Sequence, residues 1–404
     1  MKKNFRRLLL ILSLPAGIVS CSKLTPLPED SATLDGPVEG LSPVQNAQFL
    51  AGDRAFNTEV FTIETGLGPY FVATACASCH AGDGKGHPYT TLTRFGQNDS
   101  SGNLVPGGPQ LQNRAIPGYT PETIPAGATY SKFTPPANTG LGFLAALTDA
   151  QILANADPDD LNGDGISGIP NYITAPWYFS PQPFHQPFNG KYIGRFGKKA
   201  AAIDLLHQTV NAYNQDMGIT SPYALQEPAI HGITNPYPNG AGDPEISAGT
   251  VLNVVFYLRT LKAPVKRNIN ESAVIAGSQI FSNLKCAACH TPEWTTESSD
   301  LAVLSNKTFY PYTDLLLHDM GPGLDDGYTE GSAKTSEWRT PPLWGLGLAK
   351  ISQGGNYYLL HDGRATTMEQ AILMHGGEAS ESKSLYEALS ESEKKQLIEF
   401  LESL

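Results

Sequence analysis

The sequence contains the pattern Cys-x-x-Cys-His twice, once in each half of the chain. Two thiols at this spacing can add to the two vinyl groups of one porphyrin, and the histidine that follows can ligate the iron. The pattern is therefore typical of covalent attachment of c-type haem, and two copies indicate two haems. The copies supply six candidate haem-binding residues: Cys76, Cys79 and His80, then Cys286, Cys289 and His290.

The fifth and last cysteine, Cys21, follows a segment that is typical of an export signal. Residues 1–20 start with basic side chains and continue with an apolar run that is too short to span a membrane. Residues 18–21 resemble a bacterial lipobox, which predicts a lipoprotein signal peptide, a lipid anchor on Cys21 and a tether over residues 21–45. An ordinary cleaved signal with an incidental cysteine is the alternative. Both place the protein in the periplasm, and we expect the anchor to hold it at the outer membrane.

The composition limits the classes of partner. The chain has 404 residues and a net charge of −12. An acidic surface argues against binding to nucleic acid and favours a basic redox protein as electron donor. The length is sufficient for two domains, each with its own buried core.

The elements around the two motifs indicate an internal repeat. Ahead of each motif lies Gly-x-x-x-Phe in a helical pattern, at Gly52 and Phe56 in the first half and at Gly277 and Phe281 in the second. Each half also ends in a stretch with helical periodicity, at 251–261 and 385–404. Two such helices that cross beside a haem form the cytochrome c fold. The predicted fold class is therefore mainly α with long loops.

The predicted domain organisation has two cytochrome c-like haem domains, at residues 46–264 and 265–404. The first is enlarged by insertions that are rich in glycine and proline, and we expect strands and loops over 82–140.

Further segments carry a resemblance to a known family. Three segments resemble the bacterial dihaem cytochrome c peroxidase superfamily, at 339–344, 360–364 and 371–375. Three others resemble, more narrowly, the dihaem oxidoreductase family, whose members are described as peroxidases and sometimes as thiol oxidoreductases, at 194–200, 216–220 and 316–321. The resemblance implies an oxidoreductase in which electrons enter at one haem and reduce a small-molecule substrate, with peroxide the leading candidate, at the other.

The same resemblance implies a distal ligand for the second haem. The superfamily places this ligand about twelve residues beyond the His-Asp-Gly turn, which leads from Gly363 to His375, with Met374 one residue earlier. We favour His375, which would give a haem of low potential, whereas Met374 would give a higher one. His375 could also be a helix-end histidine that interacts with the helix dipole. We expect His318 and His361 to be structural.

The first haem is the expected site of peroxide chemistry. Dihaem peroxidases use a Gln and a Glu ahead of Met-Gly to move protons during O–O cleavage, and Gln208 and Asp216 hold similar positions ahead of Met217-Gly218. Two features depart from that pattern, because Asp replaces Glu and the spacing is eight residues. Met217 could instead ligate the iron itself, and Gln208 could be an ordinary surface residue of a helix.

A separate segment has the spacing of a calcium loop. Side-chain oxygens at alternate positions and a backbone carbonyl form the candidate ligand set: Asp160, Asn162, Asp164 and the carbonyl of Ile166. Position 12 of the loop is Asn171 rather than glutamate. We expect either a structural Ca²⁺ or a metal-free turn held by its own Asp and Asn side chains.

Three functions remain open at this point. The leading one is a dihaem oxidoreductase that reduces peroxide. The second is an electron-transfer cytochrome in which both irons have six ligands. The third is a protein-modifying dihaem oxidase, which the candidates His375 and Met374 disfavour because the known enzyme of that type has a tyrosine ligand there. A thiol reaction has no supporting residue, since no cysteine remains for it.

Overall fold

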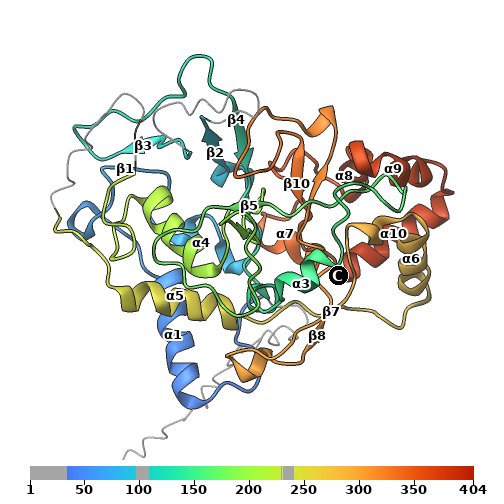
Figure 1. Cartoon of the computed structure of the whole chain (residues 1–404), viewed down its shortest axis with the longest axis horizontal. Helices are drawn as coiled ribbons and strands as arrows, with labels where there is room; N and C mark the ends of the chain where they lie inside the picture. Colours follow the sequence, from blue (N-terminus) through green and yellow to red (C-terminus); the bar gives the residue numbers. More distant parts are fainter. Residues whose placement is uncertain (1–33, 97–108, 229, 231–240) are drawn as a thin grey trace, which may run out of the picture.

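The computed structural model describes residues 34–96, 109–228, 230 and 241–404. The predicted signal peptide, Cys21 and residues 22–33 of the predicted tether lie outside the described residues. Helices account for most of the regular structure in this part of the chain (Figure 1): α1 (Pro43–Asn57), α2 (Leu141–Ala145), α3 (Asp149–Leu153), α4 (Leu205–Asn211), α5 (Ala248–Thr260), α6 (Ser272–Asn283), α7 (Ala349–Ser352), α8 (Met368–Leu373), α9 (Ser380–Glu387) and α10 (Glu391–Ser403).

The strands are short and pair two by two in antiparallel sheets. They are β1 (Tyr70–Phe71) with β3 (Arg114–Ala115), β2 (Leu92–Phe95) with β4 (Tyr130–Phe133), β5 (Tyr172–Ile173) with β6 (Tyr192–Ile193), β7 (Trp294–Thr295) with β8 (Thr308–Phe309), and β9 (Leu317–Asp319) with β10 (Glu337–Arg339). The described residues are thus partly helical with little sheet, in agreement with the predicted mixture of helices and long loops.

Two helix pairs repeat the same construction in the two halves. Figure 1 shows α1 beside α5 on the left of the molecule and α6 beside α10 on the right. A Cβ atom on Gly52 of α1 would collide with the carbonyl oxygen of Asn253 on α5, and one on Gly277 of α6 with that of Gln396 on α10. Each glycine therefore allows its two helices to cross at close range.

Capping boxes fix the first residues of α1 and α10. Ser42 caps α1 and pairs with Gln45 in a capping box, so the helix begins at Pro43, three residues before the predicted start of the first domain. Ser390 and Glu393 form a capping box at the start of α10. The backbone N–H of Val38 donates to the carbonyl of Thr260 at 2.7 Å, so part of the predicted tether already packs on the folded body.

The buried cores follow the two halves only in part. One core gathers side chains from α1, α2, α4 and α5 and also takes in Trp294, Phe309 and Trp344 from the second half. A second core lies between α6, α8 and α10. No helix in the part of the chain that the structure describes is both long enough and apolar enough to cross a membrane.

Candidate functional site

Both Cys-x-x-Cys-His motifs face one cavity. Its volume is about 490 Å³, and its lining includes every residue of the two cysteine pairs, together with His80 and His290. Each motif forms a single 3₁₀ turn, at Cys76–Ser78 and Cys286–Ala288. The second turn follows α6 closely, whereas β1 lies between α1 and the first turn. Two segments that lie far apart in the sequence are therefore brought to a shared interior space.

The two motif histidines have the same environment. Nδ1 of His80 is 2.9 Å from the carbonyl oxygen of Pro136, and Nδ1 of His290 is 3.0 Å from that of Tyr312. A ring N–H that donates to a carbonyl leaves Nε2 as the unprotonated nitrogen, which is how metal-binding histidines are usually held. Phe56 and Phe281 lie beside the two rings, with centroids 6.0 and 6.3 Å away. Burial lowers the pKa of both histidines to about 4, which keeps the rings neutral.

In the second half, the structure separates the two candidate distal residues. His375 follows α8 and lines the cavity, and its Nδ1 is 2.7 Å from the carbonyl oxygen of Ala371. Burial is the main cause of the lowered pKa of His290, and His375 lies close enough to lower it further. The side chain of Met374 is 39 % exposed and points to the surface of the molecule. The geometry therefore favours His375 as the residue that faces the second motif.

In the first half, the three predicted residues all line the cavity. Gln208 lies on α4, Asp216 ends the π-helical turn Ala212–Asp216, and the side chain of Met217 is 1 % exposed. Burial raises the pKa of Cys76 to about 12, and the negative charge of Asp216 adds to that shift, so Asp216 lies near the first motif. Burial also raises the pKa of Asp216 itself, to about 6.

A polar network that the sequence patterns did not reveal holds Asp216 in place. Nε2 of Gln110 donates to Oδ1 of Asp216 at 2.6 Å, and Nη1 of Arg94 donates to Oε1 of Gln110 at 3.2 Å. Arg94 also forms an ion pair with Glu330 at 2.6 Å, which connects the first half to the second. The amide that donates to Asp216 is that of Gln110, and Gln208 lines the same cavity. Gln110 lies next to the undescribed segment 97–108 and carries no motif that could have identified it.

The two histidines that were expected to be structural have protein partners. Nε2 of His318 is 2.8 Å from Asp314 and Nδ1 is 2.7 Å from Glu378, and these carboxylates raise its pKa although burial opposes them. The ring of His361 stacks on that of Trp338, with centroids 3.7 Å apart, and its Nε2 is 2.7 Å from Asp326.

The candidate calcium loop is held by its own side chains. Three side-chain oxygens accept hydrogen bonds from backbone N–H groups of the loop. The N–H of Gly165 donates to Oδ1 of Asp160 at 3.1 Å. The N–H groups of Asp164 and Ile166 donate to Oδ1 of Asn162 at 2.8 Å and to Oδ1 of Asp164 at 2.9 Å, in that order. These hydrogen bonds fix the shape of the loop. Over residues 34–96, 109–228, 230 and 241–404, the one group of three acidic side chains close enough to hold a metal ion lies elsewhere, at Glu227, Asp243 and Glu245.

A comparison with models of protein families gives one assignment. Residues 132–404 match the family described as "Di-haem oxidoreductase, putative peroxidase". The chain belongs to this di-haem oxidoreductase family. The match spans the second motif, α8 with His375, and most of the elements that line the cavity around the first motif. It confirms the family that the sequence segments indicated.

Comparisons with individual proteins add little to this assignment. No curated protein matches the chain. Among solved structures, the hydrazine synthase of Kuenenia stuttgartiensis is similar over 99 % of this chain and 100 % of its own, with 14 % identity and a TM-score of 0.40. A MauG-like protein associated with microbial copper homeostasis is similar over 94 % of both chains, with 16 % identity and a TM-score of 0.40.

The residues that line the cavity fit the cofactor of the di-haem oxidoreductase family. Each of the two histidines has its Nδ1 on a backbone carbonyl, and each stands next to a pair of cysteines in an interior space lined mainly by apolar side chains. As a member of this family, the protein is a dihaem redox enzyme.

Proposed function

We propose that this di-haem oxidoreductase reduces peroxide at the haem of its first half, with electrons delivered through the haem of its second half. The observation that carries the proposal is the position of Asp216. A half-buried carboxyl group lines the cavity near the first motif, and Gln110 and Arg94 hold it there. In the second half, Glu378 lines the cavity and is paired with His318 at 2.7 Å, and His375 lines the cavity as well.

The chemistry of the reaction explains why a carboxyl group is needed. Reduction of hydrogen peroxide breaks the O–O bond and consumes two electrons and two protons to give two molecules of water. When bound, haem iron supplies the peroxide-binding position and the electrons. Asp216 is placed to move a proton between the two peroxide oxygens, and a pKa of about 6 allows it to accept and to release a proton near neutral pH.

The attachment of the cofactor is part of the same proposal. Cys76 and Cys79 bind one haem through thioether bonds, Cys286 and Cys289 bind the other, and His80 and His290 are the proximal ligands. The paired helices that cross at Gly52 and Gly277 support two cytochrome c-like units. In the second unit we assign His375 as the distal ligand, because its Nδ1 faces the carbonyl of Ala371 and its ring lines the cavity.

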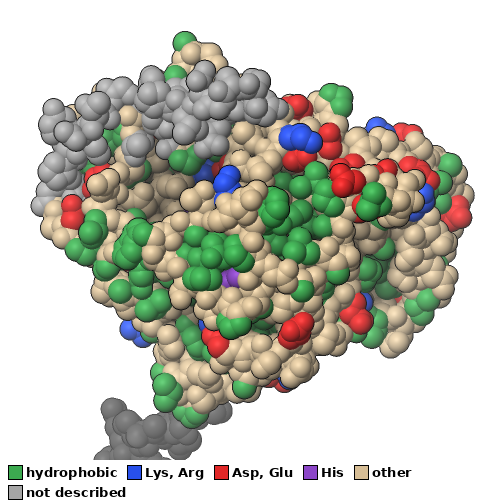
Figure 2. All heavy atoms as spheres, in the orientation of Figure 1, with side chains coloured by type: hydrophobic (Ala, Val, Ile, Leu, Met, Phe, Trp, Pro, Cys, Tyr) green, Lys and Arg blue, Asp and Glu red, His purple; other side chains and the backbone are tan. Residues whose placement is uncertain are grey.

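The cellular setting follows from the sequence. We propose export to the periplasm, cleavage before Cys21, lipidation of that residue and attachment to the outer membrane. A small basic redox protein would bind to the acidic surface and donate electrons to the protein there. Figure 2 shows acidic side chains on the face in view, several of them near the end where α9 lies. A Ca²⁺ ion in the loop of residues 160–166 would stiffen that loop.

One observation favours the alternative of an electron-transfer cytochrome. Met217 is buried, lines the cavity and follows Asp216 directly. A thioether ligand on the first iron would close the position that peroxide needs.

Spectroscopy combined with turnover separates the two functions. We expect the purified protein to consume hydrogen peroxide with an artificial electron donor, and to give a high-spin ferric signal from one haem by electron paramagnetic resonance, in the oxidised or the half-reduced form. Two low-spin haems in both forms, together with no peroxide consumption, would establish the electron-transfer alternative.

A further inference from the structure

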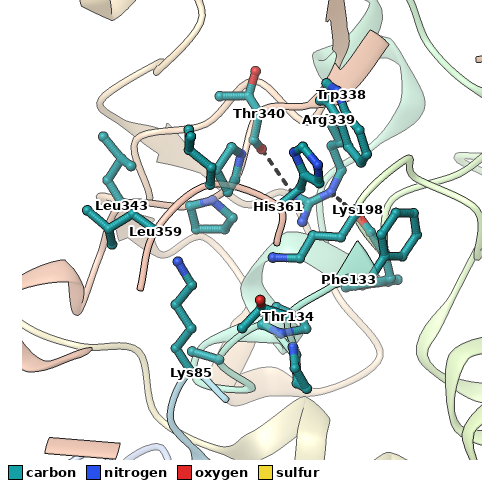
Figure 3. A pocket seen from close by; sticks show the side chains of 18 of the residues that line it. Lys85, Phe133, Thr134, Lys198, Trp338, Arg339, Thr340, Leu343, Leu359 and His361 are labelled. Atoms are coloured by element: carbon teal, nitrogen blue, oxygen red, sulfur yellow. Dashed lines mark hydrogen bonds between the residues drawn. The ribbon is translucent and has the colours of Figure 1, made fainter. Parts of the chain in front are cut away.

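Three positively charged side chains converge on the cavity from separate parts of the chain. Lys85 lies in the loop that follows the first haem motif, Lys198 follows β6, and Arg339 ends β10. All three line the cavity. Figure 3 shows the amino groups of Lys85 and Lys198 and the guanidinium group of Arg339 directed toward the same space. We call these three residues the cation cluster.

The cation cluster has no paired acid among the described residues. Arg339 donates only to backbone carbonyls, from Nε to Gly197 at 2.8 Å and from Nη1 to Thr340 at 3.1 Å. The amino groups of Lys85 and Lys198 make no hydrogen bond or ion pair within the part of the chain that the structure describes. Burial lowers the pKa of Lys85 to about 8. It lowers the pKa of Lys198 strongly, with repulsion from Lys85 and Arg339 adding to the shift and the charge of Asp362 opposing it.

The neighbouring residue Lys199 shows what a buried lysine looks like when the protein itself satisfies it. Its Nζ donates to three backbone carbonyls, those of Lys334, Thr335 and Glu337, at 3.0, 3.0 and 2.7 Å. It also lies 4.0 Å from the centre of the Trp338 ring. Lys198 has no such set of acceptors, although it is the next residue in the chain. A buried cation without an acceptor is costly, so the cation cluster indicates an anion that the polypeptide does not supply.

We propose that the cation cluster binds carboxylate groups, and that these are the propionates of the two haems. Each haem carries two propionates on the edge of the porphyrin opposite its vinyl groups, so thioether bonds to the motif cysteines leave the propionates to be held by other residues. Both motifs face the cavity that contains the cluster, and up to four carboxylates would meet three cations there. The inference rests on the proposed attachment of both haems, but not on peroxide as the substrate.

The arrangement has a consequence for electron transfer. One cation cluster that holds propionates from both haems fixes the two cofactors relative to each other with residues from both halves of the chain. Its positive charge also favours the reduced form of each haem, because reduction adds an electron near the cations. Lys85, Lys198 and Arg339 are therefore positioning residues that raise the haem potentials.

The test is the reduction potential of the haems in Lys198→Met, measured by optical titration of protein matured with its haems. We expect a lower potential for at least one haem in Lys198→Met and in Lys85→Met, no shift in Lys198→Arg, and two haems per chain in each variant. Lys132→Met is the matched control, because Lys132 is exposed on β4 and lies outside the cavity lining. If Lys198→Met does not fold, Lys85→Met decides the result.

Two outcomes would overturn the proposal. Unchanged potentials in both methionine variants, with two haems still bound, would show that the cation cluster does not act on the propionates. A spectral shift of the wild-type protein on addition of acetate or phosphate, abolished in Lys198→Met, would show that the cluster binds a free anion instead. Absence of covalent haem from the wild-type protein would refute the attachment itself, which haem staining detects separately.

Discussion

The two halves of the molecule have similar surroundings for the motif histidines but differ in the side chains that complete each site. In each half a glycine lets two helices cross, and a phenylalanine about one turn later lies beside the ring of the motif histidine. The Nδ1 atom of that histidine is within hydrogen-bond distance of a backbone carbonyl oxygen. The first half adds an acid in the cavity, Asp216, within a network of polar side chains. The second half adds a histidine, His375, beside an apolar core.

This difference indicates that the two halves share a framework that would hold a haem but differ in the residues near each iron. The shared residues are those that would hold a haem, and they depend on backbone geometry that only a few residue types allow. The residues that differ are those that would decide what else can reach each iron. A proton-carrying acid suits a site where substrate binds, whereas an imidazole that fills the position suits a site that only passes electrons.

Removal of either cysteine pair should have the largest effect, because the affected half would then lose its own haem. We expect the wild-type protein, matured in a host that attaches c-type haem, to carry the added mass of two haems. Cys76→Ala with Cys79→Ala should lose one haem, and Cys286→Ala with Cys289→Ala should lose the other. Mass spectrometry of the intact proteins gives the count, and a wild-type mass with one haem or none would disprove the assignment.

Replacement of the acid tests the chemical role of the first half. Asp216→Asn keeps the size of the side chain and its contact with Gln110 but removes its ability to transfer a proton, so turnover with peroxide should fall by about 10²–10⁴-fold. Haem content and spectra should stay unchanged. Asp300→Asn is the control, because that carboxylate is 68 % exposed and pairs with Arg259. Equal turnover of the Asp216→Asn and Asp300→Asn proteins would exclude the proton-transfer role.

Gln110→Leu and Gln208→Leu test which glutamine acts together with Asp216. The structure places the amide of Gln110 on Asp216 at 2.6 Å, whereas the side chain of Gln208 only lines the cavity. We expect Gln110→Leu to lower peroxide turnover more than Gln208→Leu does. The opposite order would favour the pair that the sequence spacing suggested.

The second half is tested at its distal residue. His375→Ala should convert one low-spin haem to high spin, visible by optical and electron paramagnetic resonance spectra. Met374→Ala should leave both spectra unchanged, because its side chain is at the surface. A spectral change in Met374→Ala alone would assign the methionine as the ligand.

The sequence was informative where local spacing carries the information. Each Gly-x-x-x-Phe segment lies within a few residues, and the structure places each segment in a helix that crosses a second helix at the glycine. The family was also evident from short segments. These features depend on the chain near them, so periodicity and residue type are sufficient to find them.

The sequence was uninformative where residues meet through long loops. Arg94, Gln110 and Glu330 come from three distant segments, and their contact depends on the path of the insertions in the first half. The cation cluster has the same origin. Lys198 and Lys199 are adjacent and identical in type, yet only Lys199 is held by backbone carbonyls. No pattern in the sequence distinguishes them, because the distinction is made by the carbonyls of residues 334–337.

The smallest effect, and the one that tests the shared framework, is expected at the two crossing glycines. Gly52→Ala places a methyl group against the carbonyl of Asn253 and the Cβ of Tyr257, and Gly277→Ala does the same at Gln396 and Phe400. The helices must move apart, so each variant should lose about 1–3 kcal/mol of unfolding free energy in urea titrations. Gly249→Ala on α5 is the control. Its new methyl group meets no atom closer than 3.5 Å, and alanine should stabilise that helix by about 0.5–1 kcal/mol. Similar losses at Gly52 and Gly277 would show that the two halves rely equally on the close crossing, whereas a loss at one glycine alone would mean that the other half is held together by different contacts.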